Sequence, residues 1–212
     1  MGQSNSLADV GLYASGPDNS DVTEAQLERC SAFSNAGNYW DRVTSPDLGG
    51  PDGNRVGQWF AKMASLASPA AVCCVSNGAN GQPIAYFLDG HASGNYAATV
   101  AKVAASGAAI DAVIWWQGEA DSATSEATYL ASLETLYADY GTEFGDPPWF
   151  VIRGAAAFST AVDNALDSFA AAHSDVTAID ISDLTGHDGT HYAYTDGYEE
   201  VGIRVHAALF GG

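Results

Sequence analysis

Short apolar runs alternate with longer amphipathic stretches along most of this chain. Four runs have the composition of buried strands: 70–76 (AAVCCVS), 112–116 (AVIWW), 149–153 (WFVIR) and 176–181 (VTAIDI). Five stretches have the composition or apolar spacing of helices: 56–66, 96–106, 127–140, 161–173 and 198–209. The alternation predicts an α/β fold, with mostly parallel strands and helices on both faces of the sheet.

The beginning of the chain has a different composition. Gly, Asn, Asp, Ser and Pro are dense before residue 56, and 47–54 (DLGGPDGN) has the residues of a loop. The length of 212 residues is typical of one domain, and 47% of the residues are hydrophobic, which is enough for a sizeable core. We therefore expect a single domain over residues 1–212.

Charge excludes some partners. Asp and Glu number 26 against 7 Lys and Arg, which gives a formal net charge of -19. Such a surface repels phosphate backbones and anionic membranes, so we expect neither nucleic acid nor membrane as a partner. The sequence suggests no cofactor, and it leaves the oligomeric state open.

The three cysteines do not form a disulfide framework. Cys30, Cys73 and Cys74 are an odd number and two are adjacent in an apolar run, which predicts buried free thiols. Neither a signal-peptide pattern nor a long uninterrupted apolar span is present, so the chain as given is expected to be soluble. Its compartment stays open: cytoplasmic, or secreted if a segment precedes Met1.

Polar motifs follow several of the predicted strands, at the edge where parallel sheets bind ligands. Asp188 and His191 lie three residues apart, so the carboxylate can accept one imidazole N–H while the other ring nitrogen faces a nucleophile. With His187 the same residues could instead bind zinc, although no HExxH or Cys/His framework accompanies them.

Two further motifs complete the set. Ser4, in Gly2-Gln3-Ser4-Asn5, is either a nucleophile or part of an ordinary turn, and no Gly-x-Ser-x-Gly motif occurs. Gln117 and Glu119 follow the run with two tryptophans. Gln117 could donate its amide N–H to an oxyanion, whereas either residue could simply cap the next helix.

Together these blocks resemble SGNH/GDSL-type hydrolases, and more narrowly the sialate O-acetylesterase and acetylxylan esterase branch, carbohydrate esterase family 6. The resemblance rests on Gly2–Asn5, Asn80-Gly81, Trp116–Asp121 and Asp188–His191, which occur in the same order. It implies a three-layer α/β/α sandwich with a mostly parallel, flavodoxin-like sheet. It also implies a serine esterase that acts on short acyl esters, acetyl esters of carbohydrates among them.

The resemblance also implies roles for individual residues. Ser4 would be the nucleophile, His191 the general base and acid, and Asp188 the orienting acid, with Glu119 as the alternative acid. The oxyanion hole would be formed by the backbone N–H groups of Ser4 and Gly81 and by the side chain of Gln117. No metal and no cofactor is implied, and the expected partner is a small-molecule or carbohydrate acyl ester.

The chain departs from the family pattern in two ways. The second block usually has a Gly-Gly turn, and this chain has Asn80-Gly81. An apolar strand usually runs into Gly-Gln-Ser-Asn, and here only Met1 precedes it, so the first strand is missing or is supplied otherwise. If the chain is a fragment, we expect its serine loop to be mobile.

Two other function classes remain open. One is a non-catalytic carbohydrate-binding or virion-associated domain that retains the esterase fold, and the other is a metal-dependent hydrolase that uses His187 and His191. Five aromatic side chains could stack on sugar rings, although aromatic residues in α/β proteins are more often part of the core: Trp40, Trp59, Trp115, Trp116 and Tyr192.

Overall fold

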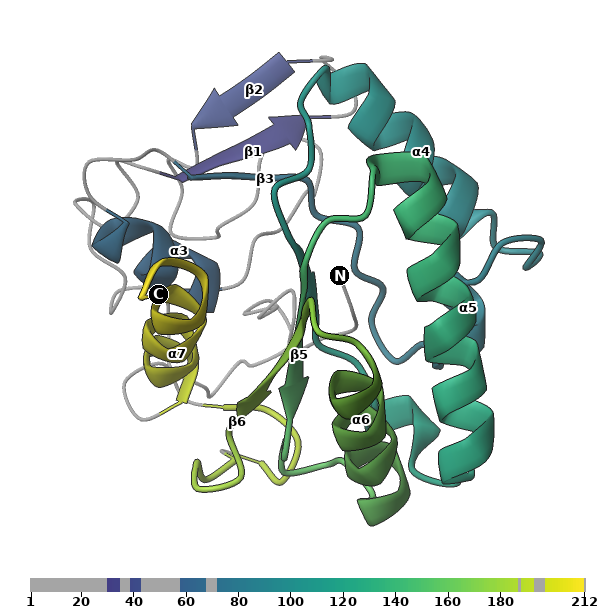
Figure 1. Ribbon diagram of the computed structural model, residues 1–212. Helices are drawn as coiled ribbons and strands as arrows, with labels where there is room; N and C mark the ends of the chain where they lie inside the picture. Colours follow the sequence, from purple (N-terminus) through teal and green to yellow (C-terminus); the bar gives the residue numbers. More distant parts are fainter. Residues whose placement is uncertain are drawn as a thin grey trace.

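The computed structural model describes residues 30–34, 39–42, 58–67, 72–186, 188–192 and 197–211 (Figure 1). Its strands form two three-stranded sheets, whereas the sequence suggests one. In the first sheet, β1 (Cys30–Ser34) pairs antiparallel with β2 (Tyr39–Arg42) and parallel with β3 (Val72–Cys74).

The second sheet is entirely parallel. It consists of β4 (Val113–Trp115), β5 (Trp149–Arg153) and β6 (Val176–Asp180), in that spatial order. The register places Ile114 and Thr177 on either side of Phe150. Because the three strands are parallel, the loops that follow them leave the sheet at the same edge.

Helices cover both faces of this sheet (Figure 1). On one side lie α3 (Gln58–Leu66) and α7 (Glu199–Phe210), which pack against each other. On the other side lie α4 (Asn95–Ser106), α5 (Glu126–Phe144) and α6 (Thr160–Ala172). Two short 3₁₀ helices, η3 (Ile84–Phe87) and η4 (Glu119–Asp121), lie in the loops after β3 and β4.

Strand alternation divides the buried residues into two cores. Phe150 and Ile152 of β5 face the helices α3 and α7, whereas Trp149 and Val151 face α5 and α6. This is the pattern expected for a strand covered on both faces, because successive side chains point to opposite sides. All four side chains are buried, which explains why 149–152 is apolar without interruption.

The predicted α/β class is confirmed, and every predicted strand and helix has a counterpart. The ends of the elements differ by a few residues, as frayed ends usually do. Residues 56–57 and 70–71 lie outside the described residues, and so does the predicted loop 47–54. The sequence did not predict β1 and β2, because their short segments lie in a stretch rich in turn-forming residues.

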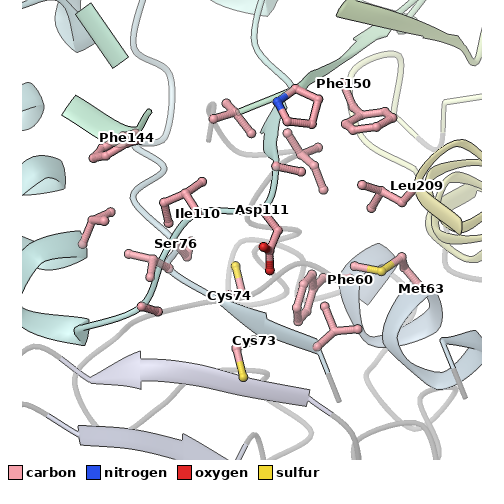
Figure 2. Close-up of a pocket in the computed structure, with 18 of the residues that line it drawn as sticks. Phe60, Met63, Cys73, Cys74, Ser76, Ile110, Asp111, Phe144, Phe150 and Leu209 are labelled. Atoms are coloured by element: carbon pink, nitrogen blue, oxygen red, sulfur yellow. The ribbon is translucent and has the colours of Figure 1, made fainter. Parts of the chain in front are cut away.

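A cavity of about 700 Å³ lies between β3 and β4 (Figure 2). Apolar side chains from both sheets and both helix layers line it, and the polar groups along it include Asp111 and the thiols of Cys73 and Cys74. Both thiols are free, as predicted, but Cys73 is exposed and Cys74 is only partly buried; the side chain of Cys30 is not among those described. The expectation of burial is wrong for Cys73 because adjacent residues of a strand face opposite ways.

None of the helices in the described part of the chain has the length and apolar content that a membrane crossing requires.

Candidate functional site

The described candidate residues lie in three loops that follow strands. Gly81 lies in the loop after β3, Gln117 and Glu119 lie after β4, and Asp188 and His191 lie after β6. Ser4 and Asn5 lie outside the described residues, as does His187.

The structure brings Asp188 and His191 into direct contact. Oδ2 of Asp188 lies 2.9 Å from Nδ1 of His191. Oδ1 of Asp188 accepts hydrogen bonds from the backbone N–H groups of Thr190, at 2.9 Å, and His191, at 2.7 Å. The carboxylate therefore holds both the ring and the backbone of the histidine. This arrangement sets the Nδ1–H tautomer and leaves Nε2 as the ring atom with basic character.

These hydrogen bonds keep Asp188 ionised. Partial burial raises the pKa of Asp188, but the N–H groups of His191 and Thr190 and the His191 ring outweigh it and lower the pKa to about 2. The carboxylate is thus charged at every pH at which an esterase would work. A charged carboxylate at this position stabilises an imidazolium on His191.

Tyr192 fixes the position of the histidine next to it. Its side chain is 2% exposed, and its hydroxyl accepts a 2.7 Å hydrogen bond from the backbone N–H of Ala156, in the loop after β5. Its ring centroid lies 6.0 Å from that of Trp116 and 6.1 Å from that of Tyr198. An isolated bridge between Gly186 and Tyr192 closes the loop that carries Asp188 and His191.

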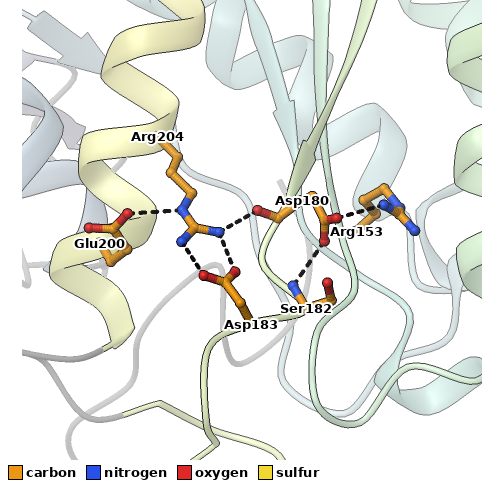
Figure 3. A network of polar contacts seen from close by, with 6 residues as sticks. All are labelled: Arg153, Asp180, Ser182, Asp183, Glu200 and Arg204. Carbon is orange, nitrogen blue, oxygen red and sulfur yellow. Dashed lines mark hydrogen bonds and ion pairs between the residues drawn. The ribbon is translucent and has the colours of Figure 1, made fainter.

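A charged network anchors the start of the same loop (Figure 3). Arg204 of α7 contacts both carboxylate oxygens of Asp183, at 2.6 and 2.8 Å, and donates to the backbone carbonyl of Asp180, at 2.6 Å. The Asp180 carboxylate accepts from the backbone N–H of Ser182 and from Arg153. The hydrogen bond from Arg204 is the main reason that the pKa of Asp183 falls to about 2. The loop after β6 is therefore tied to α7 and to β5.

The loop after β4 is organised around the buried side chain of Gln117. The amide nitrogen donates to Oδ2 of Asp121 at 2.6 Å and to the carbonyl of Gln82 at 3.2 Å. The Tyr129 hydroxyl lies 3.0 Å from Oε1 of Gln117 and 2.6 Å from its backbone carbonyl. Because a carboxylate and a carbonyl only accept hydrogen bonds, these contacts fix which way the amide points.

Asp121 connects this loop with the loop that carries Gly81. Its side chain is 3% exposed, and Oδ2 also accepts a 2.8 Å hydrogen bond from the backbone N–H of Ile84. Oδ1 accepts from the hydroxyl of Thr124 at 3.0 Å. Gly81 itself is in the left-handed region, with φ +64°, a conformation that favours glycine.

Glu119 begins η4, and its carboxylate accepts a 3.1 Å hydrogen bond from the backbone N–H of Gly118. The next α-helix, α5, is capped by Ser125, whose side chain accepts from the backbone N–H of Thr128. Neither Gln117 nor Glu119 therefore caps α5, which removes the alternative explanation that the sequence left open for both residues.

The cavity between the sheets lies elsewhere. It borders residues 108–114 and Pro148, which precede or begin β4 and β5, whereas Asp188 and His191 follow the end of β6. No group of three or more His, Cys, Asp or Glu side chains within the described ranges is arranged to hold a metal ion. The zinc hypothesis needs His187, which those ranges omit.

Four of the aromatic residues considered for sugar stacking belong to the core: Trp59, Trp115, Trp116 and Tyr192. At most 5% of any of these side chains is exposed, so they have no open face for a sugar ring. The side chain of Trp40 is not among those described.

Sequence reasoning missed two buried residues that organise the site, Asp121 and Tyr129. Asp121 stands four positions after Gln117, and an acidic residue so close to a buried strand was the available signal. Tyr129 belongs to the apolar face of α5 and has no local feature that distinguishes it from a core residue.

Two layers of helices around parallel strands, with the candidate side chains in the loops after the strands, are consistent with an SGNH-type α/β fold. The chain belongs to the family described as "carbohydrate esterase, sialic acid-specific acetylesterase", whose model matches residues 1–210. It is also similar in fold to an Arabidopsis thaliana protein solved by X-ray crystallography at 1.6 Å. The TM-score is 0.70 at 19% identity, over 90% of this chain and 82% of the other. No curated protein sequence matches this chain.

Proposed function

We propose that this protein is a serine esterase that removes short acyl groups, acetyl groups in particular, from carbohydrates. Its family is one of carbohydrate esterases, which supports esterase activity in general. The observation that carries the proposal is the contact between Asp188 and His191 beyond the end of β6, 2.9 Å from carboxylate to ring. This is the pair that a serine nucleophile requires as its base.

The reaction is a two-step acyl transfer. Oγ of Ser4 attacks the ester carbonyl carbon while Nε2 of His191 takes the hydroxyl proton. The tetrahedral intermediate collapses, and His191 gives this proton to the departing sugar oxygen. Water then attacks the acyl-serine ester, with His191 again as base, and releases the carboxylic acid and Ser4. Asp188 stays ionised throughout and balances the charge of the imidazolium.

The oxyanion that forms in each step is assigned to the backbone N–H groups of Ser4 and Gly81 and to the amide of Gln117. Both hydrogens of that amide already have acceptors, Asp121 and the Gln82 carbonyl. Gln117 can therefore join only by exchanging an acceptor. The 3.2 Å bond to the neutral Gln82 carbonyl is the one to exchange, because an oxyanion is the stronger acceptor.

The net charge of the protein narrows the class of sugar that it is expected to prefer. With a formal net charge of -19, the protein repels anionic sugars such as sialates, so we propose acetylated neutral sugars as the preferred class. Acetylated xylose oligomers and O-acetyl sialic acid, compared at low salt, test this choice. Faster hydrolysis of the sialate would contradict it.

The test of the proposed activity is hydrolysis of p-nitrophenyl acetate. We expect Ser4→Ala and His191→Ala each to lower kcat by about 10⁴-fold or more. Ser6→Ala, two positions from the nucleophile, is the matched control and should keep the wild-type rate. Activity should also survive a metal chelator.

Activity that persists in Ser4→Ala would overturn the assignment of the nucleophile. Loss of activity in chelator would favour the metal-dependent alternative. A folded wild-type protein without turnover on any acetyl ester would favour a non-catalytic carbohydrate-binding or virion-associated domain. Labelling by a fluorophosphonate, followed by peptide mass spectrometry, locates the reactive serine independently of turnover.

A further inference from the structure

We infer that Asp121 is a positioning residue that holds both oxyanion donors outside the serine loop, the Gly81 N–H and the Gln117 amide. This inference rests on the proposed esterase function. Asp121 touches none of the reacting groups; it acts through the residues that it binds.

Asp121 is buried away from solvent. The Asp121 side chain is 3% exposed, and burying a carboxylate in a protein is costly unless hydrogen bonds satisfy it. Neutral donors do so: the Ile84 N–H, the Gln117 amide and the Thr124 hydroxyl, at 2.8, 2.6 and 3.0 Å. The described residues provide no ion pair for Asp121. Hydrogen bonds from these three neutral donors, and not an ion pair, therefore hold the Asp121 carboxylate in its buried position.

The loop after β3 is held at both of its ends. Its start is tied to α4, because Lys102 donates to the Ser76 carbonyl at 2.6 Å and the Asn77 side chain bonds to Thr99. Its end is tied to Asp121 through the N–H of Ile84. Gly81 lies between these two anchors. If the Asp121 anchor is lost, the loop loses its hydrogen bond at Ile84, and near Gly81 it keeps the 3.2 Å contact from Gln117 to the Gln82 carbonyl, whose donor has then also lost Asp121.

The side-chain amide of Gln117 is held in one orientation. A side-chain amide can rotate by 180° and exchange its donor and acceptor ends. Asp121 accepts from the nitrogen while Tyr129 approaches the oxygen, so only one orientation satisfies both partners. In that orientation the nitrogen is the end that also reaches Gln82, in the Gly81 loop. Asp121 therefore sets the donor end of Gln117 toward the loop that carries the second donor.

The test compares Asp121→Ala with Asp121→Asn. Asparagine can place its oxygen where Oδ2 lies and its amide nitrogen toward Thr124, whose hydroxyl can accept. Alanine can do neither. We expect Asp121→Ala to lower kcat on p-nitrophenyl acetate by about 100-fold, the loss typical of one oxyanion donor, with KM changed less than about twofold. Asp121→Asn should stay within about fivefold of wild type.

A second readout does not depend on activity. Hydrogen–deuterium exchange of peptides that cover 82–87 should be faster in Asp121→Ala and unchanged in Asp121→Asn. Asp175→Ala is the matched control: Asp175 accepts a hydrogen bond from Tyr137 at the opposite end of β6, so its loss should leave both kcat and this exchange unchanged. Should Asp121→Ala not fold, Asp121→Ser, with a hydroxyl too short for both donors, replaces it.

Each outcome has one meaning. The inference is overturned if Asp121→Ala keeps its kcat, if asparagine fails as badly as alanine, or if exchange at 82–87 is the same in alanine and wild type. If the wild-type protein lacks esterase activity, the proposed function fails. The exchange experiment then still decides whether Asp121 holds the Gly81 loop.

Discussion

Asp188 and Asp121 both bind backbone N–H groups, but they do so in opposite surroundings. Asp188 is 40% exposed, and the groups that it contacts lie two and three residues away in the same loop. Asp121 is 3% exposed, and one of its partners, Ile84, is 37 residues away. In the loop after β6, contacts between near neighbours in the sequence thus hold the histidine in place. The loop after β4 is a buried link between segments that are distant in sequence.

The two loops are held in place by different kinds of contact. The histidine loop depends on its own turn and is fixed from outside by Ala156, which binds Tyr192, and by Arg204. The loop after β4 depends on satisfying every polar group that it buries, because an unsatisfied group in a water-excluded site is costly. We therefore expect substitutions in the first loop to affect chemistry, and substitutions around the second to affect stability as well.

The largest expected effect separates the two candidate acids. Asp188→Asn should lower kcat/KM on p-nitrophenyl acetate by about 10³- to 10⁴-fold, because the amide cannot stabilise the imidazolium and favours the wrong tautomer. Glu119→Gln should cost less than about tenfold, since the amide oxygen of glutamine can still accept the hydrogen bond from the backbone N–H of Gly118. Both variants should have circular dichroism spectra like the wild type. The reverse order of losses would make Glu119 the functional acid.

The next effect concerns stability. Tyr129→Phe deletes a buried hydroxyl that contacts Gln117 twice and accepts from Nε1 of Trp115 at 3.2 Å. We expect it to lower the free energy of unfolding by about 1–3 kcal/mol, measured by urea denaturation. Tyr137→Phe, which removes a half-buried hydroxyl bonded to Asp175, is the control and should cost less. Equal losses in the two variants would show that a buried hydroxyl and a half-buried one contribute equally to stability.

The smallest effect is a titration. The pKa of Asp188 is lowered to about 2 from an ordinary value of 3.8, so its contribution to stability is complete above 3.8 and disappears as the pH falls through about 2. His191→Ala removes the ring but keeps the backbone N–H groups. The pKa of Asp188 should therefore rise only part of the way toward 3.8, as measured by carboxyl-carbon NMR. A pKa that stayed at its wild-type value would show that the ring contributes nothing.

Sequence and structure agree best where the determining interactions are local. The strand over 149–153 is apolar at nearly every position because both of its faces are covered, and its bounds agree with β5. Asp188 and His191 could be paired in advance because they lie three positions apart in one turn. In both cases, the pattern or contact that decides the structure involves only a few consecutive residues.

The rest depends on contacts between distant segments. The spacing of residues along the chain does not predict the hydrogen bond between Ile84 and Asp121. The same is true of the hydrogen bond between Ala156 and Tyr192. The strands β1 and β2 lie in segments whose composition favours turns, so pairing between strands, rather than propensity, defines them. Ser4, which matters most to the proposed chemistry, remains a prediction from the sequence and the family.

The adjacent residues Trp115 and Trp116 have a consequence for how this protein can change over evolutionary time. One indole belongs to the core under α5 and α6, and the other belongs to the core under α3 and α7. Each core supports a different part of the site: the first contains Tyr129, and the second contains Tyr192. The sheet thus separates two cores, and substitutions at distant sites in the two cores are expected to act largely independently. The position of Gln117, the proposed oxyanion donor, and that of His191, the proposed base, should therefore respond to different sets of mutations.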